Sequence, residues 1–267
     1  RPPRSTLFPY TTLFRSVVAL VGAGGAVADV YPYLAGQTGL ASLIIPSWAQ
    51  AGGYEKMLER FQDPNQRARI IQEAENAMKL RFGGASGVLL LDSQRELLDA
   101  MKAYGIDSPG ETVIRLLEEK NQGIIARFGK ESDLIEIMQH PTTSIACDCG
   151  ASIAERGHPR GWGSFPKVLG EYVRIKKVLS LEQAIHKMSG LPAKTIGMKD
   201  RGLLQTGMVA DITIFDPETI IDHATYEEPI LMSEGIIHTL VNGQFAWKDG
   251  AATGVKAGQT LKREKPI

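Results

Sequence analysis

The sequence has few of the features that mark several classes of protein. Its 267 residues include only two cysteines and five histidines, and thirty basic residues cancel thirty acidic ones. No cluster of Lys and Arg suited to a phosphate backbone occurs, so nucleic acid is not expected as a partner. No apolar run reaches the ~20 residues of a membrane span, and the N-terminus lacks the pattern of a secretory signal. We therefore expect a cytoplasmic protein with no membrane partner.

The two cysteines, Cys147 and Cys149, are separated by one residue. So close a pair cannot join distant parts of a fold, which fits a reducing compartment. They would share one side of a strand, but no second pair of Cys or His completes a tetrahedral metal site. The histidines are scattered, with no His-x-His pair and no pair at i, i+4 spacing. We expect no complete metal site in this sequence.

Residues 1–16, RPPRSTLFPYTTLFRS, are expected to be non-native. They repeat Thr-Leu-Phe, contain no acid and keep neither helical nor strand periodicity. The segment looks like a translated sequencing adapter, and a natural basic arm is the alternative. If it is an adapter, the native frame begins within the gene, so we expect the chain to be a fragment.

The rest of the chain alternates short apolar strands with amphipathic helices. Strands are expected at residues 26–30, 88–92, 124–128 and 144–148. Helices are expected at residues 54–81 (interrupted near 63–65), 96–104, 109–121, 131–139 and 181–189. This alternation is typical of an α/β fold with a largely parallel sheet.

The pattern changes beyond about residue 200. Short strands are expected at residues 211–215, 236–241 and 244–247, and Asn242-Gly243 between the last two is a strong hairpin signal. This indicates a separate all-β unit, with a domain boundary near Asp200.

Asp148 is the main catalytic candidate, because it ends the strand expected at 144–148. In a parallel α/β barrel the carboxyl ends of the strands line the active face. The alternative is an acid in a turn or at a helix N-cap. The following residues, up to Gly163, are rich in glycine and predict a loop of the kind that binds ligands.

Three further residues carry polar groups suited to a site. Arg160 offers a planar fork that fits a carboxylate, and an ordinary surface ion pair is the alternative. Tyr31 follows a strand and could donate its hydroxyl to a substrate, or could pack at the rim of a barrel. His158 is a candidate ligand or base, but between Gly157 and Pro159 we favour a residue that holds the backbone.

Three segments occur in a characteristic order: ADVYPYLAG with TGL at residues 28–40, IACD at 145–148, and HPRGWGSFPKVLG at 158–170. Together they resemble the N-acyl-D-amino-acid deacylases (D-aminoacylases) of the amidohydrolase superfamily. The likeness continues through residues 191–193, 200–202 and 207–217 to VNG at 241–243. It covers essentially everything after residue 17.

The resemblance implies the C-terminal part of a (β/α)8 barrel at residues 17–200, with a helical insertion at about 41–122. Residues 201–267 would be the C-terminal part of a small β-sandwich. The implied activity is zinc-dependent hydrolysis of N-acyl-D-amino acids, in which Asp148 moves the proton and Arg160 and Tyr31 hold the substrate carboxylate. The metal ligands of the family lie on earlier strands, so this chain alone is expected to be inactive.

Two departures from the family pattern stand out. Cys147 and Cys149 replace the Ser and Gly that often flank the catalytic aspartate, and Gln37 replaces a small hydroxyl residue near the substrate carboxylate. Two other functions stay open at this point. One is hydrolysis of cyclic amides, as in dihydroorotases or hydantoinases, and the other is a non-catalytic barrel that serves as a scaffold.

Overall fold

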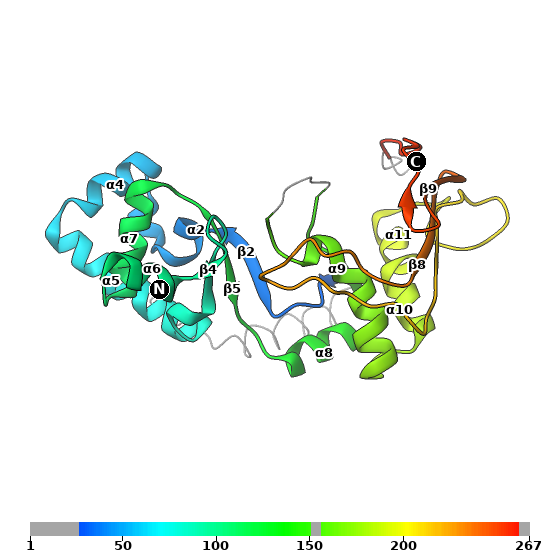
Figure 1. Ribbon diagram of the computed structural model, residues 1–267, viewed down its shortest axis with the longest axis horizontal. Coiled ribbons are helices and arrows are strands. Elements are labelled where there is room, and N and C mark those ends of the chain that lie inside the picture. Colours follow the sequence, from blue (N-terminus) through cyan, green and yellow to red (C-terminus); the bar gives the residue numbers. More distant parts are fainter. Residues whose placement is uncertain (1–26, 151–155, 262–267) are drawn as a thin grey trace, which may run out of the picture.

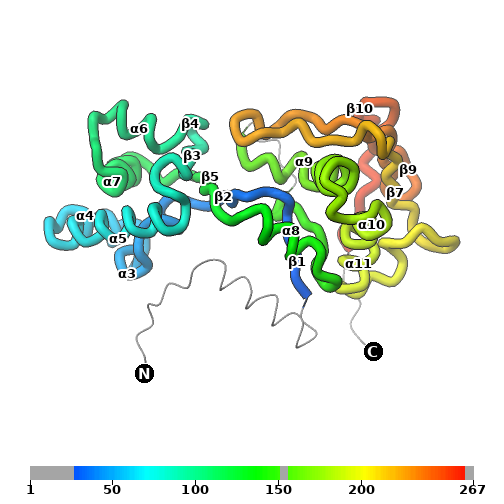
Figure 2. The backbone as a smooth tube through the Cα atoms, turned by 90° about the horizontal axis from the view of Figure 1, so that it is seen from below, coloured from blue at the N-terminus to red at the C-terminus, as the bar shows by residue number. Residues whose placement is uncertain are grey.

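The computed structural model describes residues 27–150 and 156–261. The non-native segment expected at 1–16 lies outside these ranges. Figure 1 shows an elongated molecule, with the helices of residues 40–119 at one end and the helices and strands of residues 181–252 at the other. Strands β2 (Ala35–Gly39) and β5 (Gly123–Arg127) extend from the first end toward the middle, where β1 (Ala28–Val30) and α8 (Glu131–Gln139) lie (Figure 2). No helix in the two described ranges is long and apolar enough to cross a membrane.

The middle of the molecule contains a parallel pair of strands. Strand β1 (Ala28–Val30) runs alongside β6 (Thr143–Ile145), with Val30 opposite Ile145, and α8 (Glu131–Gln139) leads into β6. The backbone N–H of Ala146 extends this pairing by donating to the carbonyl of Val30 at 2.9 Å. Both expected strands are confirmed, but β6 ends at Ile145, so Asp148 lies in the turn after it. The ends of β1 and β6 thus bring Tyr31 and Asp148 to the same edge.

A second sheet has the order β2-β5-β3-β4 and is antiparallel throughout. Its strands are β2 (Ala35–Gly39), β3 (Val88–Leu90), β4 (Arg95–Glu96) and β5 (Gly123–Arg127). The largely parallel sheet expected from the sequence is therefore wrong for the strands at 88–92 and 124–128. Alternation of strands and helices does not fix strand direction, and here the intervening helices pack mainly on one another instead of crossing over between parallel strands.

The helices between β2 and β5 surround one apolar core. They are α2 (Leu40–Ile44), α3 (Ser47–Gln50), α4 (Tyr54–Phe61), α5 (Pro64–Phe82), the 3₁₀ turn η1 (Ala85–Gly87), α6 (Leu97–Tyr104) and α7 (Pro109–Glu119). The Asp63 carboxylate caps α5 by accepting from the N–H groups of Asn65 and Gln66, and the Ser108 hydroxyl caps α7 by accepting from the Glu111 N–H at 3.0 Å. Each cap precedes a proline at the first helical position, so the break near 63–65 and the start at Pro109 are confirmed.

The other end of the molecule combines helices with an antiparallel sheet of order β10-β9-β8-β7. Its elements are α9 (Arg160–Lys167), the π-helical turn η2 (Val168–Ile175), α10 (Leu181–Met188), α11 (Gly190–Ile196), β7 (Ile212–Phe215), β8 (Ile236–Val241), β9 (Gln244–Lys248) and β10 (Ala251–Ala252). Asn242 and Gly243 have φ of 47° and 76°, as a type I′ turn requires, which confirms the hairpin.

The loop expected up to Gly163 is wrong from Arg160 onward, because these residues begin α9. Of the glycines that suggested a loop, Gly163 serves close packing instead, as does Gly170 further along. A Cβ on Gly163 would overlap the Asp222 carboxylate, and one on Gly170 would lie 2.5 Å from the Ile220 carbonyl oxygen. The segment at 220–222 therefore lies directly against the helix. Pro166, which has no N–H to donate, precedes the change to π-helical bonding.

Candidate active site

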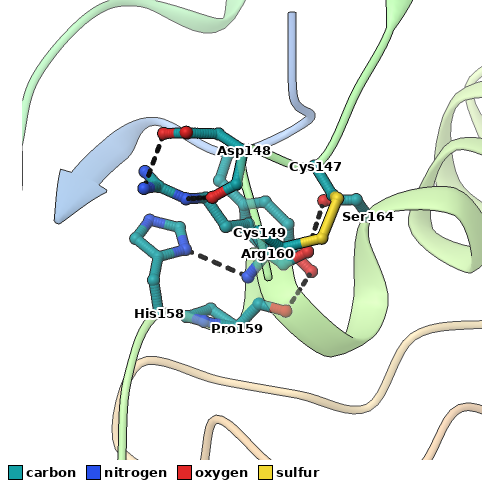
Figure 3. The surroundings of a disulfide bond; sticks show 8 residues. Cys147, Asp148, Cys149, His158, Pro159, Arg160 and Ser164 are labelled. Carbon is teal, nitrogen blue, oxygen red and sulfur yellow. Dashed lines mark hydrogen bonds and ion pairs between the residues drawn. A yellow bond between two sulfur atoms is a disulfide. The ribbon is translucent and has the colours of Figure 1, made fainter. Parts of the chain in front are cut away.

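Asp148 stands between two cysteines that the structure joins by a disulfide (Figure 3). The Cα atoms of Cys147 and Cys149 are 5.1 Å apart, within the usual range for a disulfide. Asp148 itself has a φ of 45°, in the left-handed region. Asp148 and Cys149 are exposed, while Cys147 is half-buried. No joint role was predicted for the two cysteines from the sequence. In the structure they form a disulfide on either side of the candidate catalytic acid.

Arg160 makes two contacts with Asp148 from the first turn of α9. Its Nη2 lies 2.6 Å from Asp148 Oδ2, and its Nε donates to the Asp148 carbonyl oxygen at 3.0 Å. The arginine side chain is only 10% exposed, against 66% for the aspartate, so the pair differs from an ordinary surface ion pair. The guanidinium also lies over the Tyr31 ring, 4.7 Å from its centroid. The structure thus brings together Asp148, Arg160 and Tyr31.

His158 is buried beside this group and uses both ring nitrogens. Its Nδ1 accepts from the Arg160 backbone N–H at 3.0 Å, and its Nε2 lies 2.9 Å from the Ala35 carbonyl oxygen, to which it donates. Burial lowers the pKa of His158 to about 4, and the nearby Arg160 charge acts in the same direction. The imidazole is therefore neutral at pH 7 and holds the backbone, as the sequence favoured.

Aromatic rings enclose this imidazole. Those of Tyr31, Tyr33 and Tyr226 contact it edge-on, with centroid distances between 5.3 and 5.8 Å. Burial raises the pKa of Tyr226 to about 12, so its hydroxyl stays protonated at neutral pH. In the YPY segment, Tyr31 therefore contacts both Arg160 and His158, and Tyr33 contacts His158.

A buried contact between Tyr33 and Asp222 was not expected from the sequence. The Tyr33 hydroxyl donates to Asp222 Oδ2 at 2.6 Å, and the Ala224 N–H donates to the other carboxylate oxygen at 2.8 Å. Burial, and then the bond to Asp222, raise the pKa of Tyr33 far above its usual value. The only sequence signal was Gly163, whose missing side chain leaves room for Asp222.

A cavity of about 430 Å³ opens beside the candidate residues. Asp148, Tyr31 and Tyr33 contribute to its wall, together with the apolar side chains of Val30, Leu34 and Phe128. Its size falls within the range of small-molecule sites. The wall also includes the charged residues Asp29, Lys130 and Asp133, and this combination of apolar and charged groups suits a small amphiphilic substrate.

The described residues do not provide a metal site. Within 27–150 and 156–261, no three His, Cys, Asp or Glu side chains form a group that would hold a metal ion. Both nitrogens of His158 are engaged, and Cys147 and Cys149 are bonded to each other. A zinc ion would therefore need donors from outside these ranges.

The sequence profile of the amidohydrolase family matches residues 135–246. N-acyl-D-aspartate deacylase of Alcaligenes xylosoxydans xylosoxydans is 40% identical over 168 residues, which are 62% of this chain and 32% of that protein. D-aminoacylase of the same organism is 44% identical over 141 residues, 53% of this chain and 29% of that protein. A dihydroorotase of Lactobacillus acidophilus matches less, with 35% identity over 33% of the chain and 23% of that enzyme.

Solved structures give a similar result. A crystal structure of D-aminoacylase superposes with a TM-score of 0.72 and 31% identity, covering 94% of this chain and 46% of that one. N-acyl-D-glutamate deacylase from Bordetella bronchiseptica, in complex with zinc and a phosphonate inhibitor, superposes with a TM-score of 0.65 and 30% identity. This match covers 91% of this chain and 44% of that one. The chain thus spans about a third of the length of the curated deacylases and under half of the solved ones. The chain is therefore similar to the D-aminoacylases of the amidohydrolase superfamily, in sequence and in structure.

Proposed function

We propose that the protein is a metal-dependent deacylase that hydrolyses the amide bond of N-acyl-D-amino acids, releasing a D-amino acid and a carboxylate. The observation that carries this proposal is the convergence of Asp148, Arg160 and Tyr31 beside the cavity. These residues come from the ends of two parallel strands and the start of a helix, where an α/β barrel assembles its site.

The proposal includes the arrangement of domains. The order β1, insertion, α8, β6 contains a parallel strand pair with a helix between, which is the repeating unit of a (β/α)8 barrel. We assign residues 17–200 to part of such a barrel, with the insertion at about 41–122, and residues 201–267 to part of a small β-sandwich. The TM-score of 0.72 with D-aminoacylase supports this assignment.

Arg160 and Tyr31 would hold the α-carboxylate of the substrate. The guanidinium presents two parallel N–H groups to a carboxylate, a geometry that lysine cannot reproduce. Burial of Arg160 strengthens such an ion pair by excluding water. The fixed carboxylate would then set the position of the scissile amide relative to Asp148.

Asp148 would act as general base and then as general acid. It would accept a proton as water adds to the acyl carbon, and return this proton to the nitrogen as the C–N bond breaks. Zinc belongs to the proposal because the glutamate deacylase complex contains it. Since the described residues supply no donor set for zinc, the roles assigned to this chain are substrate binding, orientation and proton transfer.

The test is hydrolysis of N-acetyl-D-aspartate, N-acetyl-D-glutamate and N-acetyl-D-methionine by the zinc-supplied full-length protein that contains this chain, with the L-enantiomers as controls. Asp148→Asn should lower kcat by about 10²-fold or more, because the amide cannot take up the proton. Asp92→Asn is a matched control, since Asp92 is also an exposed carboxylate paired with a cation, Lys120. Unchanged kcat in Asp148→Asn would refute the assigned role.

Arg160→Ala tests the carboxylate anchor separately. It should raise KM by at least about tenfold, because a charge-assisted bidentate pair is lost. Arg160→Lys should recover only part of this loss, because a point charge lacks the fork. A substrate without a free carboxylate should be unaffected, and equal effects on both substrate types would argue against the anchor.

A further inference from the structure

The disulfide encloses the residue to which the proposed function assigns proton transfer. Cys147 and Cys149 flank Asp148 directly, so the bond between their sulfurs closes a small ring that contains the Asp148 backbone. Such a ring forces a tight turn at its middle residue. Asp148 accordingly has a φ of 45°, a region that non-glycine residues seldom adopt.

In this turn, both polar groups of Asp148 point to one partner. The carboxylate contacts Arg160 Nη2 at 2.6 Å, and the backbone carbonyl oxygen accepts from Arg160 Nε at 3.0 Å (Figure 3). The guanidinium is therefore occupied on the side that faces Asp148. One carboxylate oxygen of Asp148, Oδ2, is thereby held on the arginine, although the aspartate side chain is 66% exposed.

These contacts oppose the proposed reaction. Hydrolysis requires Arg160 to bind the substrate carboxylate and Asp148 to be available for the water. With the disulfide closed, Nη2 and Nε of Arg160 are instead paired with Oδ2 and the carbonyl oxygen of Asp148. A substrate would have to displace the Asp148 carboxylate from Arg160, although the disulfide ring still holds the Asp148 backbone in the same turn.

We propose that the Cys147–Cys149 disulfide is a reversible redox modification site that holds Asp148 on Arg160, and that its reduction releases both residues for catalysis. This inference rests on the proposed function. Without the ring, the backbone at Asp148 is free to leave the left-handed region and continue the extended direction of β6. The carbonyl and the carboxylate would then no longer face the same guanidinium, because the carbonyl of an extended residue lies along the hydrogen-bonding direction of the strand and its side chain stands roughly perpendicular to it.

The co-reactant is a dithiol, either a small molecule or the dithiol of a protein reductant. Its thiolate attacks one sulfur, and exposed Cys149 is the accessible partner, so the S–S bond breaks and a mixed disulfide forms. The second thiol of the reductant then displaces this cysteine. Two electrons and two protons pass to Cys147 and Cys149, and the reductant becomes a disulfide. Oxidised glutathione would reverse the process.

The first experiment measures geometry without depending on hydrolysis. The protein is oxidised with glutathione disulfide or reduced with dithiothreitol, the reagents are removed, and alkylation of the peptide containing Cys147 and Cys149 verifies each state. Phenylglyoxal, which modifies arginine, should react with Arg160 at least about fivefold faster in the reduced form, because Asp148 no longer covers it. Exposed Arg95 should react equally in both forms and serves as the internal control.

The second experiment measures hydrolysis of the three N-acetyl-D-amino acids in both states. The reduced form should have at least about tenfold higher kcat/KM. The double variant Cys147→Ser/Cys149→Ser should have the kcat/KM of the reduced form, and neither glutathione disulfide nor dithiothreitol should change it. Cys147→Ser/Cys149→Gly provides a second route to the same open state if the first variant folds poorly.

The two proposals fail in different ways. Equal reactivity of Arg160 in two verified redox states would overturn the switch, and so would equal hydrolysis in both states, which would leave the deacylase assignment intact. Failure of glutathione disulfide to form the bond would overturn it as well. No hydrolysis by the zinc-supplied full-length protein in either state would overturn the proposed function, and the Arg160 reactivity would then decide the geometry of the switch alone.

Discussion

Acidification should destabilise the protein through His158. Burial, helped by the Arg160 charge, holds the pKa of this histidine at about 4, below its ordinary value of 6.5. The unfolded state therefore binds a proton first as the pH falls. The stability that the neutral imidazole contributes is fully present above about pH 6.5 and is lost as the pH falls toward 4. A difference of about 2.5 pKa units corresponds to about 3 kcal/mol of unfolding free energy.

Urea unfolding at several pH values between about 7.5 and 4.5 would measure this loss, provided it is compared with a variant that cannot titrate. His158→Gln keeps a neutral hydrogen-bonding side chain. It should be less stable than the parent at neutral pH, and the gap should narrow steadily with acidification. The carboxylates titrate in both proteins, so their contribution cancels in the comparison.

The matched control is His186→Gln, the same substitution at an exposed histidine on α10. The difference in unfolding free energy between this variant and the parent should not narrow with acidification as it does for His158→Gln. Parallel curves for the parent and His158→Gln would refute the reasoning, because they would mean that the folded protein accepts the proton on His158 without cost.

Two further substitutions test the packing and capping described above. Gly163→Ala should lower the free energy of unfolding in urea by about 2 kcal/mol or more, because its Cβ would overlap the Asp222 carboxylate. Asp222→Gly in the same chain should restore part of this stability. A double variant whose loss of stability equals the sum of the two single losses would contradict this contact. Ser108→Ala should cost about 1 kcal/mol by removing the acceptor for the Glu111 N–H, and a cost near zero would show that the cap does not contribute.

Local features of the fold were predictable because their signals are local. The Asp63 and Ser108 caps precede prolines at the first helical position, and Asn242-Gly243 adopts the turn that its residue types favour. Strand direction was not predictable in this way. It depends on where the chain goes between Gly39 and Gly123, and no short segment encodes that path.

The site was predictable in part. Asp148, Arg160 and Tyr31 were chosen from strand ends and from a resemblance, and the structure places them together. The contact of Tyr33 with Asp222 joins residues far apart in the sequence, and it could not be inferred from either neighbourhood. The helix at Arg160 was missed because glycines that allow close packing look the same in a sequence as glycines that make turns.

The two hydrogen bonds of His158 connect the arginine to a distant part of the chain. One bond reaches Ala35 on β2, the strand that leads into α2 to α7, and the other reaches the backbone of Arg160. The imidazole therefore links β2 to the backbone at the start of α9. Under the proposed function, a displacement of β2 would also move Arg160, so residues that never touch a substrate would still influence how tightly it binds.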